Sequence, residues 1–195
     1  MRLYPDSPLL LETPAEWTLH VIRNLDDFLI DHAACEKKAS GMAISLISHY
    51  PDRIKLVEAM ADLAIEELAH YKEVIKVLHS RGLTLQADEK DTYINAFRKH
   101  VRNGKDNYFL DRLVLAGIVE ARGAERFGLI AEALPAGQLK QMYKAITRSE
   151  VRHYALFIDL AKEYFSAETV EKRAHELLVV EADIINTLPI QAKLH

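Results

Sequence analysis

The sequence predicts an all-α protein, mainly a bundle of four long helices with shorter helices added to it. Apolar residues recur at intervals of three and four along almost the whole chain, and no long alternating stretch occurs, which favours helices over strands. Only 7 glycines and 6 prolines occur in 195 residues, too few for a turn-rich all-β protein. Four of the segments between turn signals are about 25 to 30 residues long, so each would form a helix roughly 40 Å in length.

The first predicted helix is short. It follows Thr13-Pro14-Ala15-Glu16, which has the pattern of a capping box with proline at the first helical position, and it breaks near Asn24. The first long helix is expected from about Leu25 to His49, where Pro51 stops it.

The second long helix is expected from about Asp52 to Ser80, because Gly82 ends its pattern. The segment Leu83 to Lys90 is predicted to be a linker. A shorter helix follows, from about Asp91 to Arg102, and Asn103-Gly104 ends it.

The last part of the chain is divided by two prolines and a serine. Asp106 is expected to cap a third long helix that runs to Leu134, before Pro135. A fourth is expected from about Gly137 to Tyr164. Ser166 is expected to cap a final helix that ends before Pro189.

The composition restricts the class of protein. The length suits one domain with a sizeable core or two very small domains, and we expect a single domain over residues 1–195. The one cysteine, Cys35, excludes a disulfide within the chain, a Cys-based zinc site and a Cys-ligated iron–sulfur cluster. The start, MRLYPDSPLL, lacks the layout of a signal peptide, and no window approaches 18 uninterrupted apolar residues. We therefore expect a cytoplasmic protein that does not span a membrane.

Each long helix carries one glutamate within its apolar stripe, and two of the helices also carry a histidine three residues later. A buried carboxylate costs several kcal/mol unless a cation or a hydrogen-bond network compensates it. Arginine and lysine are scarce on these stripes, so a metal cluster is the economical source of positive charge. The candidate metal ligands, which would also be the catalytic groups, are Glu36, Glu67, His70, Glu120, Glu150 and His153.

The spacing of these residues indicates two hairpins of the same design. Glu36 and Glu67 are 31 residues apart, and Glu120 and Glu150 are 30 residues apart. In an antiparallel hairpin with a short turn, such residues lie at the same height, so all six side chains are expected to converge. Two Glu and two Glu-x-x-His on four helices are the dimetal-carboxylate set of ferritin-like bundles. Mixed oxygen and imidazole ligands suit iron or manganese. The alternative is that these side chains are solvated, or paired with Arg122 or Arg152.

Neighbouring residues leave further alternatives open. His32 lies one turn before Glu36 and is expected either beside that carboxylate or in the core or at its rim. Gly117 and Gly123 flank Glu120 and would either leave room for a substrate or allow close helix packing. Three further acidic residues are expected to be solvated, namely Asp31, Glu66 and Glu125, and the alternative is that Asp31 or Glu66 orients an imidazole. His195 is expected at the surface.

Three segments resemble one enzyme family. His32-Ala-Ala-Cys-Glu-Lys-Lys-Ala-Ser40, Glu66-Glu-Leu-Ala-His-Tyr71 and Arg148-Ser-Glu-Val-Arg-His-Tyr154 are similar to segments of the tRNA hydroxylases called MiaE. This resemblance implies a ferritin-like fold with two iron ions, O2 as co-substrate, and hydroxylation of the isopentenyl side chain of 2-methylthio-N6-isopentenyladenosine at tRNA position 37. By matching position, the six candidate ligands would be the family's iron ligands.

The resemblance also implies partners. The reaction needs two external electrons, and the chain has no flavin fingerprint, so a separate reductase system is expected beside the tRNA. A monomer or small oligomer is expected. The alternatives are another di-iron oxygenase, a manganese catalase, or an iron-binding and storage protein, because this fold hosts all of them. A further alternative is a structural bundle whose metal site is vestigial.

One segment is a candidate for nucleic-acid binding. The net charge of −4 gives no overall attraction to tRNA, so positive potential must be local. The densest basic run holds Arg98, Lys99, Arg102 and Lys105. We expect these side chains to contact phosphates, although basic residues also favour a helix C-terminus for dipole reasons alone.

Overall fold

The computed structural model describes residues 7–195; part of the N-terminal stretch used to exclude a signal peptide lies outside them. Within the described residues there are seven α-helices and no strand. They are α1 (Ala15–Arg23), α2 (Leu25–His49), α3 (Ile54–Ser80), α4 (Thr92–Arg98), α5 (Lys105–Ala133), α6 (Gln138–Tyr164) and α7 (Ala167–Thr187). Two compact units are formed: one comprises residues up to Ile22 with Lys90–Ile190 and His195, and the other comprises Arg23–Glu89 with Gln191–Leu194. None of the helices in this part of the chain combines the length and apolarity needed to cross a membrane.

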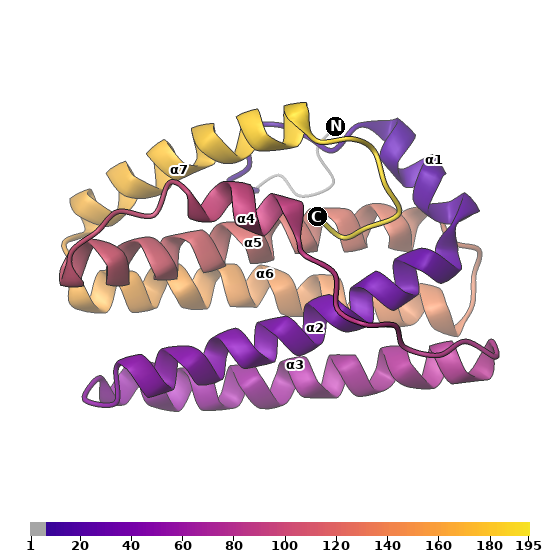
Figure 1. Ribbon diagram of the computed structural model, residues 1–195, viewed down its shortest axis with the longest axis horizontal. Helices are drawn as coiled ribbons and strands as arrows, with labels where there is room; N and C mark the ends of the chain where they lie inside the picture. Colours follow the sequence, from indigo (N-terminus) through magenta and orange to yellow (C-terminus); the bar gives the residue numbers. More distant parts are fainter. Residues whose placement is uncertain (1–6) are drawn as a thin grey trace. The chain divides into compact units, whose positions relative to one another are not determined.

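The smaller unit is an antiparallel hairpin of α2 and α3, which lie side by side (Figure 1). Its buried face is formed by the apolar residues that recur at helical spacing, among them Leu29, Leu46, Met60, Leu63 and Leu78. Helix α3 begins two residues later than predicted, because residues 51–53 are used for the turn.

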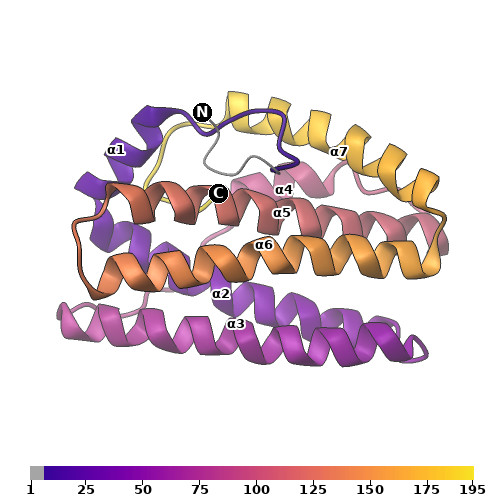
Figure 2. The ribbon, with the colours of Figure 1, turned by 180° about the vertical axis from the view of Figure 1, so that it is seen from behind.

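The larger unit contains the second antiparallel hairpin, formed by α5 and α6 (Figure 2). Helix α7 packs on both of these helices, and α4 packs on α7. Because these helices cover α5, most of its surface is buried. Its buried residues include several charged residues as well as apolar ones. The fold therefore places a long, largely buried helix beside α6, which faces solvent on one side.

The other helix ends follow the sequence closely, with three further differences. Asp91 and Ser166 cap α4 and α7 by accepting hydrogen bonds from Ile94 N and Thr169 N, at 2.9 and 3.2 Å. Helix α4 ends at Arg98 rather than Arg102. Helix α5 begins at Lys105, so that Gly104, with φ of 96°, occupies the cap position expected for Asp106.

The third difference concerns the capping box at Thr13. The Thr13 backbone N–H and hydroxyl both donate to Glu125 of α5, at 2.8 and 2.6 Å. The hydroxyl therefore ties the N-terminal segment to the buried face of α5, a role the local pattern could not reveal.

Candidate metal centre

The smaller unit brings three of the six predicted ligands together. Glu36 of α2 faces Glu67 and His70 of α3, and their ligand atoms lie within 4.8 Å of one another. His70 Nδ1 is 3.6 Å from Glu36 Oε2 and 3.5 Å from Glu67 Oε2. Both carboxylate side chains are buried, and the histidine is 12% exposed.

Local geometry explains this arrangement. Glu67 and His70 are three residues apart and so share one face of α3. The Ser40 hydroxyl, one turn beyond Glu36, donates to the Ala64 carbonyl oxygen at 2.9 Å. This buried hydrogen bond fixes the register of the hairpin beside the ligands.

The ionisation states of Glu36, Glu67 and His70 depend on one another. Burial alone would raise the pKa of Glu36, but hydrogen bonds from His32 and His70 outweigh it and hold that pKa well below its usual range. Burial alone would lower the pKa of His70, but its contacts with Glu36 and Glu67 raise that pKa to about 10. An imidazolium therefore balances part of the negative charge when no metal is bound, and a metal cation must displace its proton.

The larger unit brings the other three predicted ligands together. Glu120 of α5 meets Glu150 and His153 of α6, with ligand atoms again within 4.8 Å of one another. His153 Nδ1 is 3.5 Å from Glu150 Oε2, and all three residues are buried. The i, i+3 pair of α6 thus repeats the design of the pair on α3.

The donors present in each hairpin fit a divalent cation. Two carboxylates and one imidazole offer hard oxygen ligands and an intermediate nitrogen ligand, the combination that suits iron or manganese. The two negative charges of each set equal the charge of one divalent ion, which would relieve the cost of burying them.

His32 is fully buried and lies beside Glu36 rather than elsewhere in the core. Its Nε2–H donates to Glu36 Oε1 at 2.5 Å, one turn along the same helix. Phe28 packs near the imidazole, with ring centroids 6.1 Å apart.

The two glycines near Glu120 differ in what surrounds them. A Cβ at Gly117 would lie 3.2 Å from Phe157 Cβ and 3.5 Å from the Tyr154 carbonyl oxygen, so this glycine allows α5 and α6 to pack closely. A Cβ at Gly123 would meet Phe127 and Glu150 at 3.8 and 3.9 Å, which are ordinary contacts. Close packing is therefore required at Gly117 and not at Gly123.

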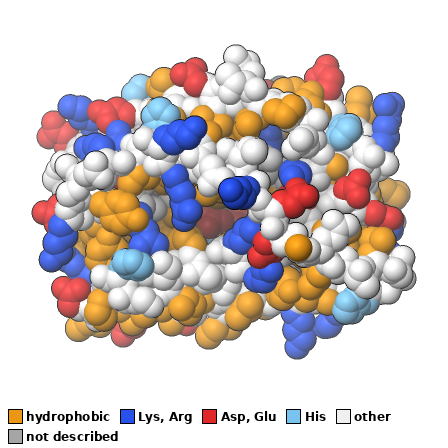
Figure 3. Space-filling view, in the orientation of Figure 1, with side chains coloured by type: hydrophobic (Ala, Val, Ile, Leu, Met, Phe, Trp, Pro, Cys, Tyr) orange, Lys and Arg blue, Asp and Glu red, His pale blue; other side chains and the backbone are white. Residues whose placement is uncertain are grey.

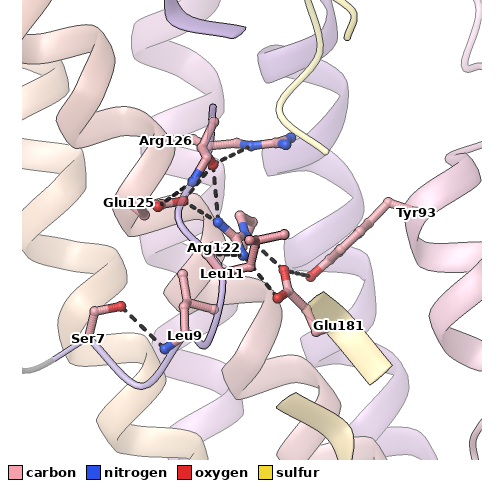
Figure 4. Close-up of polar contacts among 9 residues, drawn as sticks. Ser7, Leu9, Leu11, Tyr93, Arg122, Glu125, Arg126 and Glu181 are labelled. Carbon is pink, nitrogen blue, oxygen red and sulfur yellow. Dashed lines mark hydrogen bonds and ion pairs between the residues drawn. The ribbon is translucent and has the colours of Figure 1, made fainter. Parts of the chain in front are cut away.

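A buried polar cluster in the larger unit was missed by sequence reasoning (Figure 4). The guanidinium of Arg122 is fully buried and donates to both oxygens of Glu181 on α7, at 2.7 and 2.9 Å. It also pairs with Glu125 and donates to the Leu11 carbonyl oxygen at 2.9 Å. Glu181 accepts a further hydrogen bond from the Tyr93 hydroxyl at 3.3 Å.

Arg126 completes this cluster. Its Nε–H donates to the Thr13 hydroxyl oxygen at 3.3 Å, and its guanidinium lies 4.7 Å from the centroid of the Trp17 ring. Burial lowers the pKa of Arg126 to about 10, and the nearby positive charge of Arg122 adds to that effect. The cluster links the N-terminal segment, α4, α5 and α7, so it is a network that ties these elements together.

Three residues that were expected at the surface or in solvent instead have side chains that are buried or contact other residues. Glu125 is buried in the cluster just described. Asp31 accepts a hydrogen bond from Leu194 N at 2.8 Å. The imidazole of His195 stacks on Tyr93, with centroids 4.9 Å apart and planes 10° apart.

The basic run extends from the last residue of α4, Arg98, to the first residue of α5, Lys105, and its members differ in their surroundings. Arg98, Lys99 and Lys105 are exposed. Arg102 instead pairs with the buried Asp111, its Nη2 2.7 Å from Asp111 Oδ1. Acidic side chains are interspersed among the Lys and Arg side chains on the face shown in Figure 3. Three of the four predicted phosphate contacts are therefore accessible without breaking an ion pair with Asp111.

Two helical hairpins, each with a buried set of carboxylates and an imidazole, define a ferritin-like all-α protein. A solved structure, protein 43 with aldehyde deformylating oxygenase activity from Synechococcus, matches the fold with a TM-score of 0.91. It is 30% identical, and the match covers 96% of this chain and 94% of that one. The predicted fold class is confirmed.

The particular family follows from the sequence. The family model described as tRNA-(MS[2]IO[6]A)-hydroxylase (MiaE) matches residues 4–195, and the chain belongs to this family. A relative from Pseudomonas putida, 30% identical over 100% of this chain and 96% of its own length, is named tRNA 2-(methylsulfanyl)-N(6)-isopentenyladenosine(37) hydroxylase. A relative of the same name from Salmonella typhimurium is 26% identical over 94% of this chain and 85% of its own length. The resemblance noted in the sequence is confirmed.

Proposed function

We propose that this protein is a non-haem di-iron monooxygenase that hydroxylates the isopentenyl side chain of 2-methylthio-N6-isopentenyladenosine at position 37 of tRNA. The observation that carries this proposal is a chain of the MiaE family that buries two carboxylates and one imidazole in each of its two hairpins. The substrate is the one named for the relatives from Pseudomonas and Salmonella.

The proposed centre takes one iron ion per hairpin set. Its ligands are Glu36, Glu67, His70, Glu120, Glu150 and His153. With this set, residues 1–195 act as a single ferritin-like di-iron domain. When bound, two ferrous ions would together reduce dioxygen and so supply the oxidant for hydroxylation of an allylic C–H bond of the isopentenyl group.

The chain itself contributes charge, orientation and a dry environment. The carboxylates balance the positive charge of the metal ions, and the hydrogen bonds around them fix their orientation. Apolar residues one turn from the ligands, Leu63, Ile146 and Phe157, are almost completely buried. They exclude water from the reacting groups, which protects a reactive oxidant from being quenched.

The reaction requires partners. Each turnover consumes O2 and two electrons, which a separate reductase system provides. Because its proposed substrate is tRNA, we propose that the enzyme acts in the cytoplasm. We propose a monomer or small oligomer. Arg98, Lys99 and Lys105 are exposed and are proposed to contact tRNA phosphates, with Arg102 joining them where its pairing with Asp111 permits.

Mass spectrometry of tRNA nucleosides tests the proposed function. A strain that lacks this protein should contain the isopentenyl nucleoside and lose its hydroxylated form. Wild-type protein should restore the hydroxylated form, whereas Glu150→Ala, which removes one proposed ligand, should not. Persistence of the hydroxylated nucleoside in the deletion strain would refute the proposal.

A second candidate is a di-iron oxygenase that acts on another substrate. It is favoured by the likeness to a Synechococcus protein with aldehyde deformylating oxygenase activity. Purified, reduced protein should be given tRNA that carries the isopentenyl nucleoside, or a fatty aldehyde, under O2. Hydroxylation of tRNA alone supports the first candidate, and turnover of the aldehyde alone supports the second.

A further inference from the structure

The two oxygens of Glu36 have different surroundings. Oε1 accepts a hydrogen bond of 2.5 Å from His32 Nε2, and Oε2 faces His70 Nδ1 at 3.6 Å. His32 is 0% exposed and Glu36 is 4% exposed, so water does not compete with this contact. Because the two residues lie one turn apart on α2, the helix itself holds the donor against the acceptor.

We propose that His32 is a positioning residue that occupies Glu36 Oε1, so that Glu36 presents only Oε2 to a metal ion. This inference rests on the proposed metal centre and adds to it a specific coordination mode, a carboxylate that binds through one oxygen. A buried hydrogen bond to a ligating carboxylate orients the ligand and tunes its donor strength. His32 therefore decides how Glu36 binds, without touching the metal itself.

The residue that corresponds to His32 differs in the other hairpin. The residue four positions before Glu120, the counterpart of Glu36 on α5, is Ala116. Its methyl group cannot donate a hydrogen bond, so α5 offers no equivalent of His32 at that position. The two hairpins are alike in their ligands and differ in this supporting residue.

Three substitutions of His32 distinguish the effect of losing the hydrogen-bond donor from the effect of changing the side-chain volume. In His32→Gln, the side-chain amide can reach the position of the lost Nε2–H and donate to Glu36. In His32→Asn the amide is one carbon shorter and falls short of that position. His32→Leu fills much of the same space with no donor. His49→Leu, a change of an exposed histidine on the same helix, is the matched control.

The measurements use purified metal-free protein titrated anaerobically with Fe²⁺, and infrared difference spectra of carboxylate stretches in protein labelled with ¹³C-glutamate. One-oxygen binding separates the asymmetric and symmetric stretches more widely than two-oxygen binding. In His32→Leu and His32→Asn we expect the separation between the asymmetric and symmetric stretches of one carboxylate to become smaller. We also expect Fe²⁺ affinity to fall by about 10- to 100-fold. In His32→Gln and His49→Leu both should stay near wild type.

The outcomes distinguish this inference from the metal centre itself. If wild-type protein binds no Fe²⁺, both are overturned. If wild type binds Fe²⁺ and all His32 variants match it in splitting and affinity, only the role of His32 is overturned. If His32→Leu fails to fold, the pair of amide variants decides: equal spectra for His32→Gln and His32→Asn overturn the inference, and a wild-type spectrum for the glutamine variant alone supports it.

Discussion

Arg122 is a fully buried cation whose neighbours are buried anions. Replacing it with methionine keeps much of the volume and leaves the carboxylates of Glu125 and Glu181 without their main counter-charge. Breaking a buried pair in this way costs about 3 to 5 kcal/mol. We expect urea unfolding of Arg122→Met to show a loss of this size, and Arg148→Met, at an exposed position, to change stability by less than about 0.5 kcal/mol.

Gly117 and Gly123 allow a matched comparison. Alanine in place of glycine within a helix gains about 0.5 to 1 kcal/mol. At Gly123 the added methyl meets ordinary contacts, so we expect Gly123→Ala to raise the stability of metal-free protein by this amount. At Gly117 the methyl meets Phe157 Cβ, which cannot move without its helix, and overpacking costs about 1 to 3 kcal/mol. Denaturant unfolding should therefore show Gly117→Ala to be less stable than Gly123→Ala; the reverse order would contradict close packing at Gly117.

The sequence indicated some residues of the site and was silent about others, for a physical reason. Glu67 and His70 share a helix face, so their spacing alone predicts that they meet. Arg122 contacts Leu11 and Thr13 of the N-terminal segment and Glu181 of α7, and no periodic pattern relates these segments. Its other partner, Glu125, lies three residues further along α5. The network of Arg122 was therefore not recognised as a whole, although Glu125 stands at the same i, i+3 spacing from Arg122 as the members of each Glu-x-x-His pair. That all six ligands form one centre stays a prediction.

Asp111 joins elements of the larger unit. It accepts hydrogen bonds from Arg102, before α5, and from Arg173 of α7, at 2.7 and 2.8 Å. Burial alone would raise the pKa of Asp111, but these hydrogen bonds outweigh it and hold that pKa below its ordinary value of 3.8.

A lowered folded-state pKa gives stability that is present above the ordinary pKa and lost as pH falls through the lowered one. We expect wild-type protein to lose stability through this carboxylate as the pH falls below about 4. In Asp111→Asn this part of the acid slope should vanish, and stability at pH 7 should be about 3 kcal/mol lower. Thermal melts of both proteins across this pH range provide the measurement; equal acid slopes would contradict the prediction.

The segment between α4 and α5 provides a prediction about tRNA. Replacing Arg98, Lys99 and Lys105 with serine should weaken tRNA binding and flatten its salt dependence, because fewer counter-ions are released. Arg102→Ser should in addition lower the melting temperature, since it breaks the pair with Asp111. Filter binding at several salt concentrations measures the first effect.

A charge-matched control is available on other helices. Serine at the exposed Lys72, Lys76 and Lys162 removes the same number of charges. If this control variant loses as much tRNA affinity and salt slope as the first, the segment has no special part in binding.

The element boundaries show where prediction from sequence succeeds. Helix α2 begins and ends at the predicted residues, because asparagine and proline interrupt the chain there. Helix α4 stops four residues early. In place of the predicted last turn, the backbone N–H of Arg102 donates a hydrogen bond to the side-chain oxygen Oδ2 of Asp111. This partner lies nine residues away, and helix propensity does not register such a contact.

At the scale of the whole molecule, bound metal should determine stability. Each hairpin buries two carboxylates that a divalent ion would compensate, and a ligand that binds only the folded state stabilises it. At a free metal concentration of 100 times Kd the gain is about 2.7 kcal/mol per site. We expect Fe²⁺ to raise the melting temperature and about two ions to bind per chain.

A double variant serves as the control for this prediction. Glu36→Ala with Glu150→Ala removes one proposed ligand from each hairpin, so added metal should no longer shift its melting curve. Coincident curves for wild-type protein with and without metal would mean that the proposed ligands do not hold it.

The all-α fold was predictable because helical periodicity runs through nearly every element, and the ferritin-like class because the carboxylate spacing repeats in both hairpins. The sequence indicated the division into two compact units only in part. The predicted linker Leu83 to Lys90 ends at the boundary between Glu89 and Lys90, but it is not rich in glycine or proline, and the hydrophobic pattern is alike on both sides of it. A single domain over the whole chain remains a prediction.

The cluster around Arg122 also has a consequence for the order of folding. Thr13 and Glu125 are 112 residues apart, whereas the contacts of the α5–α6 hairpin are local. Closing so long a loop carries a high entropic cost, so the hairpin is expected to form early and the cluster late. Interactions absent from the transition state slow unfolding and leave the folding rate unchanged. The network of Arg122 would thus lower the unfolding rate and lengthen the lifetime of the native state, with little effect on the folding rate.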